Sequence, residues 1–165
     1  MSSSPTVPVP LFAAPDYQAQ IQARYERVQA RVQAWLPAAQ LEHVGASSIP
    51  GALSKGDLDI AVLVVPSELE RCVQTLIGAG YTEQQDTLRT PELCMLNSAA
   101  GDADEHALQL VAAGSSFATQ FLAFRDRLRA DPAQLAAYNA LKLRHAGEGP
   151  DGYRAAKARF IEALL

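Results

Sequence analysis

The sequence is short of cysteine, of long apolar runs and of internal repeats, and each shortage excludes a class of protein. Two cysteines in 165 residues, Cys72 and Cys94, provide neither a disulfide framework nor the spacing of a metal site. No run of about 20 apolar residues could span a bilayer, and no segment repeats with a period of about 20 to 50 residues. We therefore expect two buried thiols in a protein of the reducing cytoplasm, and neither a membrane protein nor a solenoid.

An excess of positive charge is also absent. Lysine and arginine together number 14 against 18 aspartates and glutamates, which leaves a net charge of −4. This balance argues against a broad basic surface for duplex nucleic acid, although it is compatible with a small anionic ligand. The N-terminal residues lack the basic start of a signal peptide, so we expect a soluble protein.

What is present suits one folded domain. Apolar residues make up 48% of the chain and charged residues 19%, and a chain of 165 residues is long enough to form its own core. Residues 1–14 are rich in serine, proline and alanine, which predicts a flexible N-terminal arm. Residues 15–165 are expected to form the single domain, and the sequence leaves its oligomeric state open.

Hydrophobic spacing predicts an α+β protein in which helices outnumber strands. Apolar residues between Tyr17 and Trp35 recur every three or four positions, which indicates a helix that Asp16 would cap. Asp131 and Asp151 would cap the last two helices of a C-terminal helical portion. The further helices are expected to carry Leu69 to Ile77, Phe117 to Leu128, Leu135 and Tyr138, and Tyr153 to Leu164.

The strands are expected to form a small mixed sheet flanked by these helices. Residues 57–65, DLDIAVLVV, end in six apolar residues, as a strand buried on both faces would. Residues 92–97 and 105–111 are separated by small and acidic turn residues, which predicts a hairpin. Two further strands are expected at residues 41–44 and from about Tyr81.

Two aspartates, Asp57 and Asp59, stand at the polar start of the buried strand. Residues two apart on a strand point to the same face, so the two carboxylates are expected to lie side by side. Such oxygen ligands suit Mg²⁺ or Mn²⁺, and Mg²⁺ commonly takes one or two protein carboxylates with waters and substrate phosphates. The alternative is that both acids merely form the solvated end of a strand.

A glycine-containing loop precedes the aspartate pair. Gly45 would allow a close approach to a ligand, and the hydroxyls of Ser47 and Ser48 can donate to phosphate oxygens. The loop does not fit a Walker A motif, because Lys55 stands four residues after Gly51 instead of directly after it. Loop and aspartates together predict a phosphate-bearing ligand held with a divalent cation.

These segments resemble the GrpB-like proteins, a branch of the nucleotidyltransferase superfamily. The resemblance covers roughly residues 16–165. It is carried by HVGASSIPG and K-x-x-x-D-I-x-V in residues 43–62, by LAFRDRLRADPAQLAAYNALK in residues 122–142, and by YRAAKARFIEALL at the C-terminus. It implies a nucleotidyltransferase-like fold in which a glycine–serine loop holds the triphosphate and strand carboxylates hold the metal ions.

The resemblance carries over to this chain residue by residue. Gly45 and Ser47 match the glycine–serine element, although Ala46 separates them where the wider superfamily has the two adjacent. Asp59 matches the aspartate of the GrpB pattern, and Asp57 restores the pair of the wider superfamily. The resemblance therefore implies that Asp57 and Asp59 are the metal ligands and catalytic carboxylates.

A third acid, which completes the metal site in active superfamily members, is missing at its expected position. Gln109 stands where that carboxylate is expected on a neighbouring strand. Asp104 and Glu105 are nearby in sequence, yet a shift of two residues along a strand moves a side chain by about 6.6 Å. His43, His106 and Gln109 are candidates for lining the cleft, and a structural role for His43 is the alternative.

Three basic residues on the C-terminal helices are candidate phosphate partners. They are Lys142, Lys157 and Arg125, each within or beside a segment that carries the resemblance. For the two lysines the alternative is a solvated side chain beside a core tyrosine. For Arg125 the alternative is a structural ion pair with Asp126.

Three functions follow from this sequence. The first is Mg²⁺-dependent binding of a nucleoside triphosphate with nucleotidyl transfer to an acceptor that the sequence does not identify. The second is a catalytically reduced nucleotide-binding or regulatory module that keeps the fold without the third acid, which Gln109 favours. The third is an interaction domain without a ligand. The Asp57–Asp59 pair favours the first, because two adjacent like charges are costly unless a cation balances them.

Overall fold

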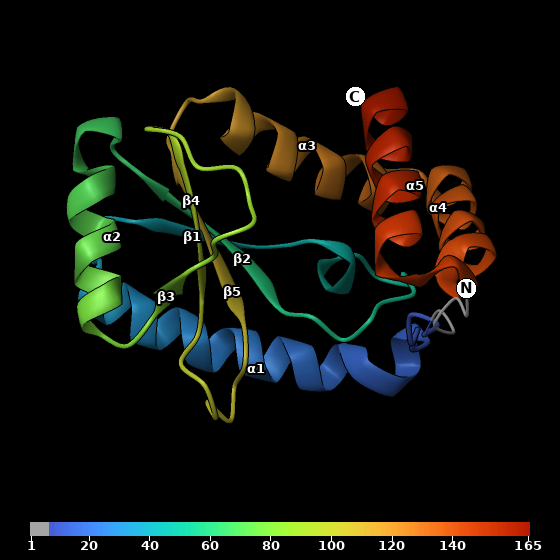
Figure 1. Cartoon of the computed structure of the whole chain (residues 1–165), viewed down its shortest axis with the longest axis horizontal. Helices are drawn as coiled ribbons and strands as arrows, with labels where there is room; N and C mark the ends of the chain where they lie inside the picture. The colour runs from blue at the N-terminus through green and yellow to red at the C-terminus, as the bar shows by residue number, and fades with distance from the viewer. Residues whose placement is uncertain (1–6) are drawn as a thin grey trace, which may run out of the picture.

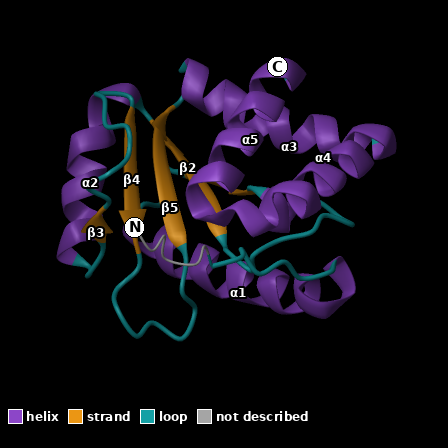
Figure 2. Ribbon diagram, turned by 45° about the vertical axis from the view of Figure 1, so that its right-hand side comes forward, coloured by secondary structure: helices purple, strands orange, loops and turns teal. Residues whose placement is uncertain are grey.

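The computed structural model describes residues 7–165 of the chain. It is an α+β fold with one five-stranded mixed sheet and five α-helices (Figures 1 and 2). The elements in chain order are α1 (Ala14–Trp35), β1 (Gln40–Val44), β2 (Asp59–Val64), α2 (Leu69–Gly78), β3 (Thr82–Glu83), β4 (Leu93–Asn97), β5 (Ala107–Ala112), α3 (Ser116–Ala130), α4 (Pro132–His145) and α5 (Gly149–Leu164).

The sheet has the strand order β1-β2-β5-β4-β3. Strands β2 and β5 are parallel to each other, and every other neighbouring pair is antiparallel, so the expected mixed sheet and the β4–β5 hairpin are confirmed. Because β2 lies between two other strands, its apolar run is shielded at both edges. At its start Asp59 is paired with Val44 of β1 and with Ala107 of β5.

The two faces of the sheet are covered by different helices. Alternate residues of β2 and β5, such as Ile60 and Leu108, pack against α1 and α2 in the main core. The opposite face carries Leu63, Met95 and Val111 and packs against the first turns of α3. Figure 2 shows the strands between α2 and the helices α3–α5. Side chains at the starts of β2 and β5 on the α3 face therefore point toward the C-terminal helices.

The C-terminal helices form a third apolar cluster with the loop that follows β1. Ile49 and Ala52 of that loop pack with Phe124 and Leu128 of α3 and with Tyr138 of α4. Figure 1 places α4 and α5 at the end of the molecule opposite α2. The loop after β1 is thus enclosed between the sheet and the helices.

Two of the three expected helix caps are wrong, and the reason is the same in each. Pro15 and Pro150 lie in the first turn of α1 and α5, and each helix begins before its proline. Asp16 and Asp151 therefore fall inside the first turn instead of capping it. Asp131 precedes its proline and is a true cap, because its carboxylate accepts from two backbone N–H groups at 3.1 and 3.2 Å.

Part of the segment expected to be an arm lies along the domain. The N–H of Val9 donates to the carbonyl of Ala146 at 2.8 Å, and Phe12 forms a two-way backbone bridge with Ser54. Residues 1–6 of the expected arm lie outside the described residues. The division into an arm of residues 1–14 and a domain of residues 15–165 stays a prediction.

The structure also bears on the two cysteines and on the question of a membrane-spanning helix. Cys72 and Cys94 are both buried free thiols, as expected. Within residues 7–165, no helix combines the length and the apolar character needed to cross a membrane.

Candidate functional site

The candidate site lies at the start of β2, level with the end of β1 and the start of β5. Val44 is the last residue of β1 and pairs with Asp59, and Gly45 then turns the chain away with a φ of 75°. On the other side β5 begins at Ala107, also level with Asp59. Asp57 therefore has no strand to pair with and lies outside β2. The expectation that both aspartates sit on one strand is wrong in this respect.

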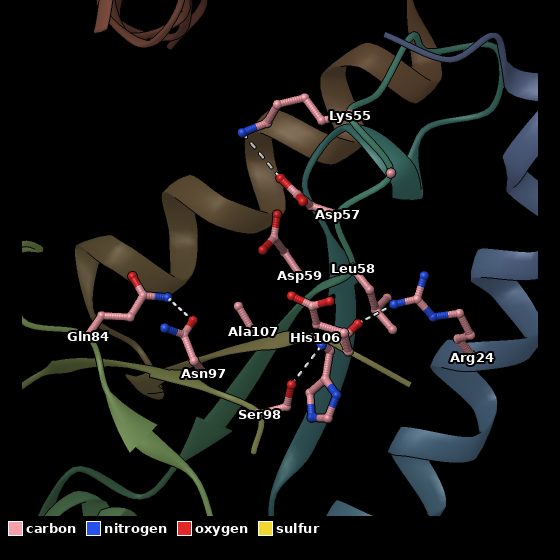
Figure 3. Close-up of a pocket in the computed structure, with 12 residues that line it drawn as sticks. Arg24, Lys55, Asp57, Leu58, Asp59, Gln84, Asn97, Ser98, His106 and Ala107 are labelled. Atoms are coloured by element: carbon pink, nitrogen blue, oxygen red, sulfur yellow. Dashed lines mark hydrogen bonds and ion pairs between the residues drawn. The ribbon is translucent and has the colours of Figure 1, made fainter. Parts of the chain in front are cut away.

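The two carboxylates nevertheless face a common space (Figure 3). Asp59 is half-buried, and this burial, followed by the nearby charge of Asp57, raises its pKa to about 6. Lys157 and Lys55 act in the opposite direction. Asp57 is exposed, and its carboxylate lies 3.3 Å from the ammonium of Lys55. The acid pair therefore has one lysine in contact with Asp57 and a second, Lys157, whose charge also acts on Asp59.

A wide polar cavity lies on one side of the pair. Its volume is about 590 Å³, and Asp57 and Asp59 form part of its wall. Figure 3 shows the remaining polar side chains around it, from α1, from the segment after β3 and from the β4–β5 turn. They are Arg24, Gln84, Asn97, Ser98, Glu105 and His106.

A smaller aromatic cavity lies on the other side of the same two aspartates. Its volume is about 170 Å³, and it separates the loop after β1 from the C-terminal helices. Gly45, Ser47 and Asp59 line it from the sheet side, and Lys157 of α5 lines it from the helix side. Four aromatic rings and one amide also line it, and they belong to Phe121, Phe124, Tyr138, Tyr153 and Gln109.

The loop after β1 is packed directly against Asp59. A Cβ placed on Gly45 would lie 2.9 Å from Oδ2 of Asp59, so only glycine lets the backbone come this close. The hydroxyl of Ser47 lines the aromatic cavity and lies 3.0 Å from Nε2 of His43. The hydroxyl of Ser48 instead donates to the carbonyl of Gly45 at 2.6 Å, and Ser48 lines neither cavity.

Of the three basic candidates, Lys157 is the one brought to a cavity. Burial, followed by the charge of Lys55, lowers its pKa, while Asp59 and Asp57 raise it. Lys142 is fully buried elsewhere: its ammonium donates to the carbonyl of Leu53 and lies 4.3 Å from the ring centre of Tyr138. Burial, with a smaller effect of Lys157, lowers the pKa of Lys142 to about 7.

Arg125 lies away from both cavities. Its guanidinium donates to the Glu42 carboxylate at 2.7 Å, to the carbonyl of His43 at 3.1 Å and to Asp126 at 2.9 Å. The side chain is buried, and its partners tie α3 to β1. This is the structural ion pair that the sequence left open as the alternative.

The two histidines are neutral groups with structural partners. Burial, followed by Arg129 and Arg125, lowers the pKa of His43 to about 4, and its ring stacks on Tyr25 at 5.1 Å. His106 donates from Nδ1 to the Asp104 carbonyl at 2.6 Å, so its Nε2 accepts from the Tyr81 hydroxyl at 2.6 Å. His106 lines the polar cavity, but both of its ring nitrogens are already occupied.

The register of β2 and β5 changes the search for a third acid. Ala107 is level with Asp59, whereas Gln109 is level with Ala61, two positions farther along the sheet. Glu105 precedes Ala107 by two positions and lines the polar cavity with both aspartates. Glu105 is near Gln109 in sequence, but the sequence alone did not assign it to the site. The available signal was that residues 105, 107 and 109, spaced by two, point to the same face of an extended strand.

Asp104 is committed elsewhere, because Arg27 donates to it at 2.7 Å. Among residues 7–165, no three His, Cys, Asp or Glu side chains are already arranged to hold a metal ion. The pair Asp57 and Asp59 alone does fit one divalent cation, since Mg²⁺ often takes only one or two protein carboxylates. Burial, followed by the charge of Asp57, raises the pKa of Asp59, and a bound cation would favour its charged form.

Comparison with known proteins places this geometry in a family. Residues 14–165 match the family model described as "GrpB protein". The UPF0157 protein of Vibrio cholerae is 46% identical over 154 residues, which cover 93% of this chain and 80% of the relative. The UPF0157 protein of Deinococcus radiodurans is 34% identical over 145 residues, which cover 87% and 74%.

Two solved structures resemble the fold at low sequence identity. The conserved protein GrpB from Enterococcus faecalis superimposes with a TM-score of 0.75 at 20% identity, covering 94% of this chain and 96% of that one. The Cid1 poly(U) polymerase with bound MgGTP superimposes with a TM-score of 0.52 at 16% identity. That match covers 78% of this chain but 41% of Cid1, so it concerns the shared nucleotidyltransferase-like fold.

Proposed function

The chain belongs to the GrpB family of the nucleotidyltransferase superfamily, and we propose that it binds a nucleoside triphosphate with Mg²⁺ or Mn²⁺ and transfers a nucleotidyl group. The acceptor would be a hydroxyl-bearing molecule in the polar cavity. The fold is shared with Cid1, which was solved with MgGTP and with Mg 3′-dATP. The two buried free thiols fit a reducing compartment, so we also propose a cytoplasmic location.

One observation carries the proposal. Asp57 and Asp59 form the shared wall of the two cavities, and Gly45 brings the backbone of a loop against the carboxylate of Asp59. Lys157 faces the same carboxylates from α5. Carboxylates for a cation, a glycine turn and a lysine in one place are the groups that a metal-bound triphosphate requires.

Each residue has a defined part in this reaction. Asp57 and Asp59 would hold the cation, which supplies neutralisation of charge on the reacting phosphate oxygens. Ser47 and the backbone beside Gly45 would donate to phosphate oxygens, and Lys157 would balance their charge from the helix side. In the transfer, the acceptor oxygen would bond to the α-phosphorus as the bond to pyrophosphate breaks, and the proton of the acceptor hydroxyl would pass to solvent in the polar cavity, where the acceptor would lie.

Thermal unfolding with Mg²⁺ and each of the four common nucleoside triphosphates tests the binding step. A ligand at about 100 times its dissociation constant adds about 2.7 kcal/mol, so the midpoint should rise by about 5 to 10 °C. We expect Asp59→Asn to abolish the rise, and Asp86→Asn, an exposed acid away from β2, to keep it. Absence of any Mg²⁺-dependent rise in the wild type would falsify the proposal.

The second candidate is a reduced module that binds a nucleotide without transferring it. It is favoured by the lack, within the described part of the chain, of a preformed three-carboxylate site. Counting bound Mn²⁺ by electron paramagnetic resonance, in the presence of the best-bound nucleotide, separates the two. Two ions, reduced to one by Glu105→Gln, support transfer chemistry, whereas one ion in both proteins supports the module.

A further inference from the structure

Gln109 is a half-buried residue whose amide oxygen is unpaired within residues 7–165. Its Oε1 is buried and has no hydrogen-bond partner in the described part of the chain. The residues beside it on the neighbouring strands are Ala61 and Met95, and neither side chain can donate a hydrogen bond to it. Buried polar atoms in folded proteins are normally paired, so an unpaired amide oxygen at a cavity is available to a bound ligand.

Gln109 is also out of position for a metal ligand. It is two residues beyond Ala107, which is the residue level with Asp59, and that displacement along β5 is about 6.6 Å. It lines the aromatic cavity, while Glu105 lines the polar one. Gln109 is therefore in a position to contact a ligand in the aromatic cavity.

The rest of the aromatic cavity suits a flat ring. Its wall includes the rings of Phe121, Phe124, Tyr138 and Tyr153, and its volume of about 170 Å³ is that of roughly six water molecules. A space of this size suits one ring system. Lys157 and the two aspartates, where the phosphates would lie, line the same cavity.

We propose that the aromatic cavity binds the nucleobase of the triphosphate and that Gln109 determines which base is bound. This inference rests on the proposed function. The amide carries both a donor and an acceptor, and rotation about its last bond exchanges them, so it can pair with the hydrogen-bonding edge of a base. A base whose donor and acceptor lie elsewhere relative to its sugar would leave the amide unpaired and would bind less tightly.

The test is a set of titrations with Mg²⁺ and the four common nucleoside triphosphates, and with inorganic triphosphate as a probe that lacks a base. The wild type should prefer one base, and Gln109→Leu should reduce that preference by about tenfold or more. Its affinity for inorganic triphosphate should be unchanged. The midpoint of the ligand-free variant should not fall, because an unpaired buried amide is removed.

Two further variants keep the experiment decisive. Gln84→Leu makes the same change on the wall of the polar cavity and should keep the wild-type preference. Gln109→Met, which preserves side-chain length, replaces the leucine variant if that one fails to fold. If nucleotides bind but no variant of Gln109 alters base preference, this inference is wrong and the proposed function stands. If neither nucleotides nor inorganic triphosphate bind, both are wrong.

Discussion

At the scale of single residues, Gly45 has the most restrictive surroundings in the site. Its φ of 75° lies in the left-handed region, and a Cβ there would press on Oδ2 of Asp59 at 2.9 Å. We expect Gly45→Ala to lower the free energy of unfolding by about 1–2 kcal/mol, because this backbone disfavours any side chain. Because the carboxylate must also move, nucleotide affinity with Mg²⁺ should fall by more than about tenfold. Urea unfolding and calorimetry measure the two effects.

Gly101 provides the matched control for this substitution. Its φ is 81°, but no atom lies within 4 Å of the Cβ that an alanine would add. Gly101→Ala should therefore show a similar loss of stability with unchanged nucleotide affinity. Equal affinity in the two variants would show that the contact with Asp59 is unimportant for binding.

His43 predicts a specific dependence of stability on pH. Burial, followed by two arginines, lowers its folded-state pKa to about 4, below the unfolded value of 6.5. Protons therefore bind the unfolded chain more tightly, and this contribution to stability is lost as the pH falls from 6.5 toward 4. The loss should approach about 3 kcal/mol.

The comparison that isolates this effect is His43→Gln, which stays neutral and keeps a polar group near Ser47. Chemical unfolding at intervals from pH 8 to pH 4 should give curves that diverge below about pH 6.5, with the wild type falling faster. Parallel curves for the two proteins would mean that His43 does not carry the loss.

At the scale of elements, the loop after β1 is held by side chains from several helices. Arg129 of α3 donates to the carbonyl of Ser48 at 2.8 and 3.1 Å, and Gln18 of α1 donates to the carbonyl of Ile49 at 2.7 Å. From α4, Asn139 accepts from the N–H of Leu53 at 2.9 Å. The loop is thus a rigid support for Lys55 and Asp57, which follow it.

Asn139 is the most direct test of this support, because it also donates to the carbonyl of Gly51 at 3.1 Å. We expect Asn139→Ala to lower the free energy of unfolding by about 1–2 kcal/mol, since two backbone groups lose their partner. Nucleotide affinity should fall with it. Gln134→Ala, at an exposed position of the same helix, should change neither quantity. Unchanged affinity in Asn139→Ala would show that the site does not depend on the loop.

The elements could largely be predicted from apolar spacing, whereas their boundaries and surroundings could not. The run after Asp59 identified β2, but the exclusion of Asp57 depends on where β1 and β5 end, which one segment alone does not reveal. Lys142 belongs to a polar residue type and is fully buried only because the loop folds over α4. Gln109 and Glu105 could be assigned to different cavities only once the register was known.

At the scale of the whole molecule, the site lies where separately packed parts meet. The sheet with α1 and α2 forms one apolar core, and the C-terminal helices form another with the loop after β1. The aromatic cavity has one wall from each part. A ligand that bridges Asp59 and Lys157 would therefore join both parts at once.

This arrangement predicts how hydrogen exchange should respond to a nucleotide with Mg²⁺. At about 100 times the dissociation constant, amides exposed by opening of the site should exchange about 100-fold more slowly. We expect this slowing together in residues 45–57 and in α5, because the ligand contacts both. Amides of α2, which packs on the opposite face of the sheet, serve as an internal control. Those that exchange by local opening should keep their exchange rates when the nucleotide binds. Asp59→Asn should remove the effect from both segments, whereas slowing confined to residues 45–57 would mean that α5 takes no part in binding.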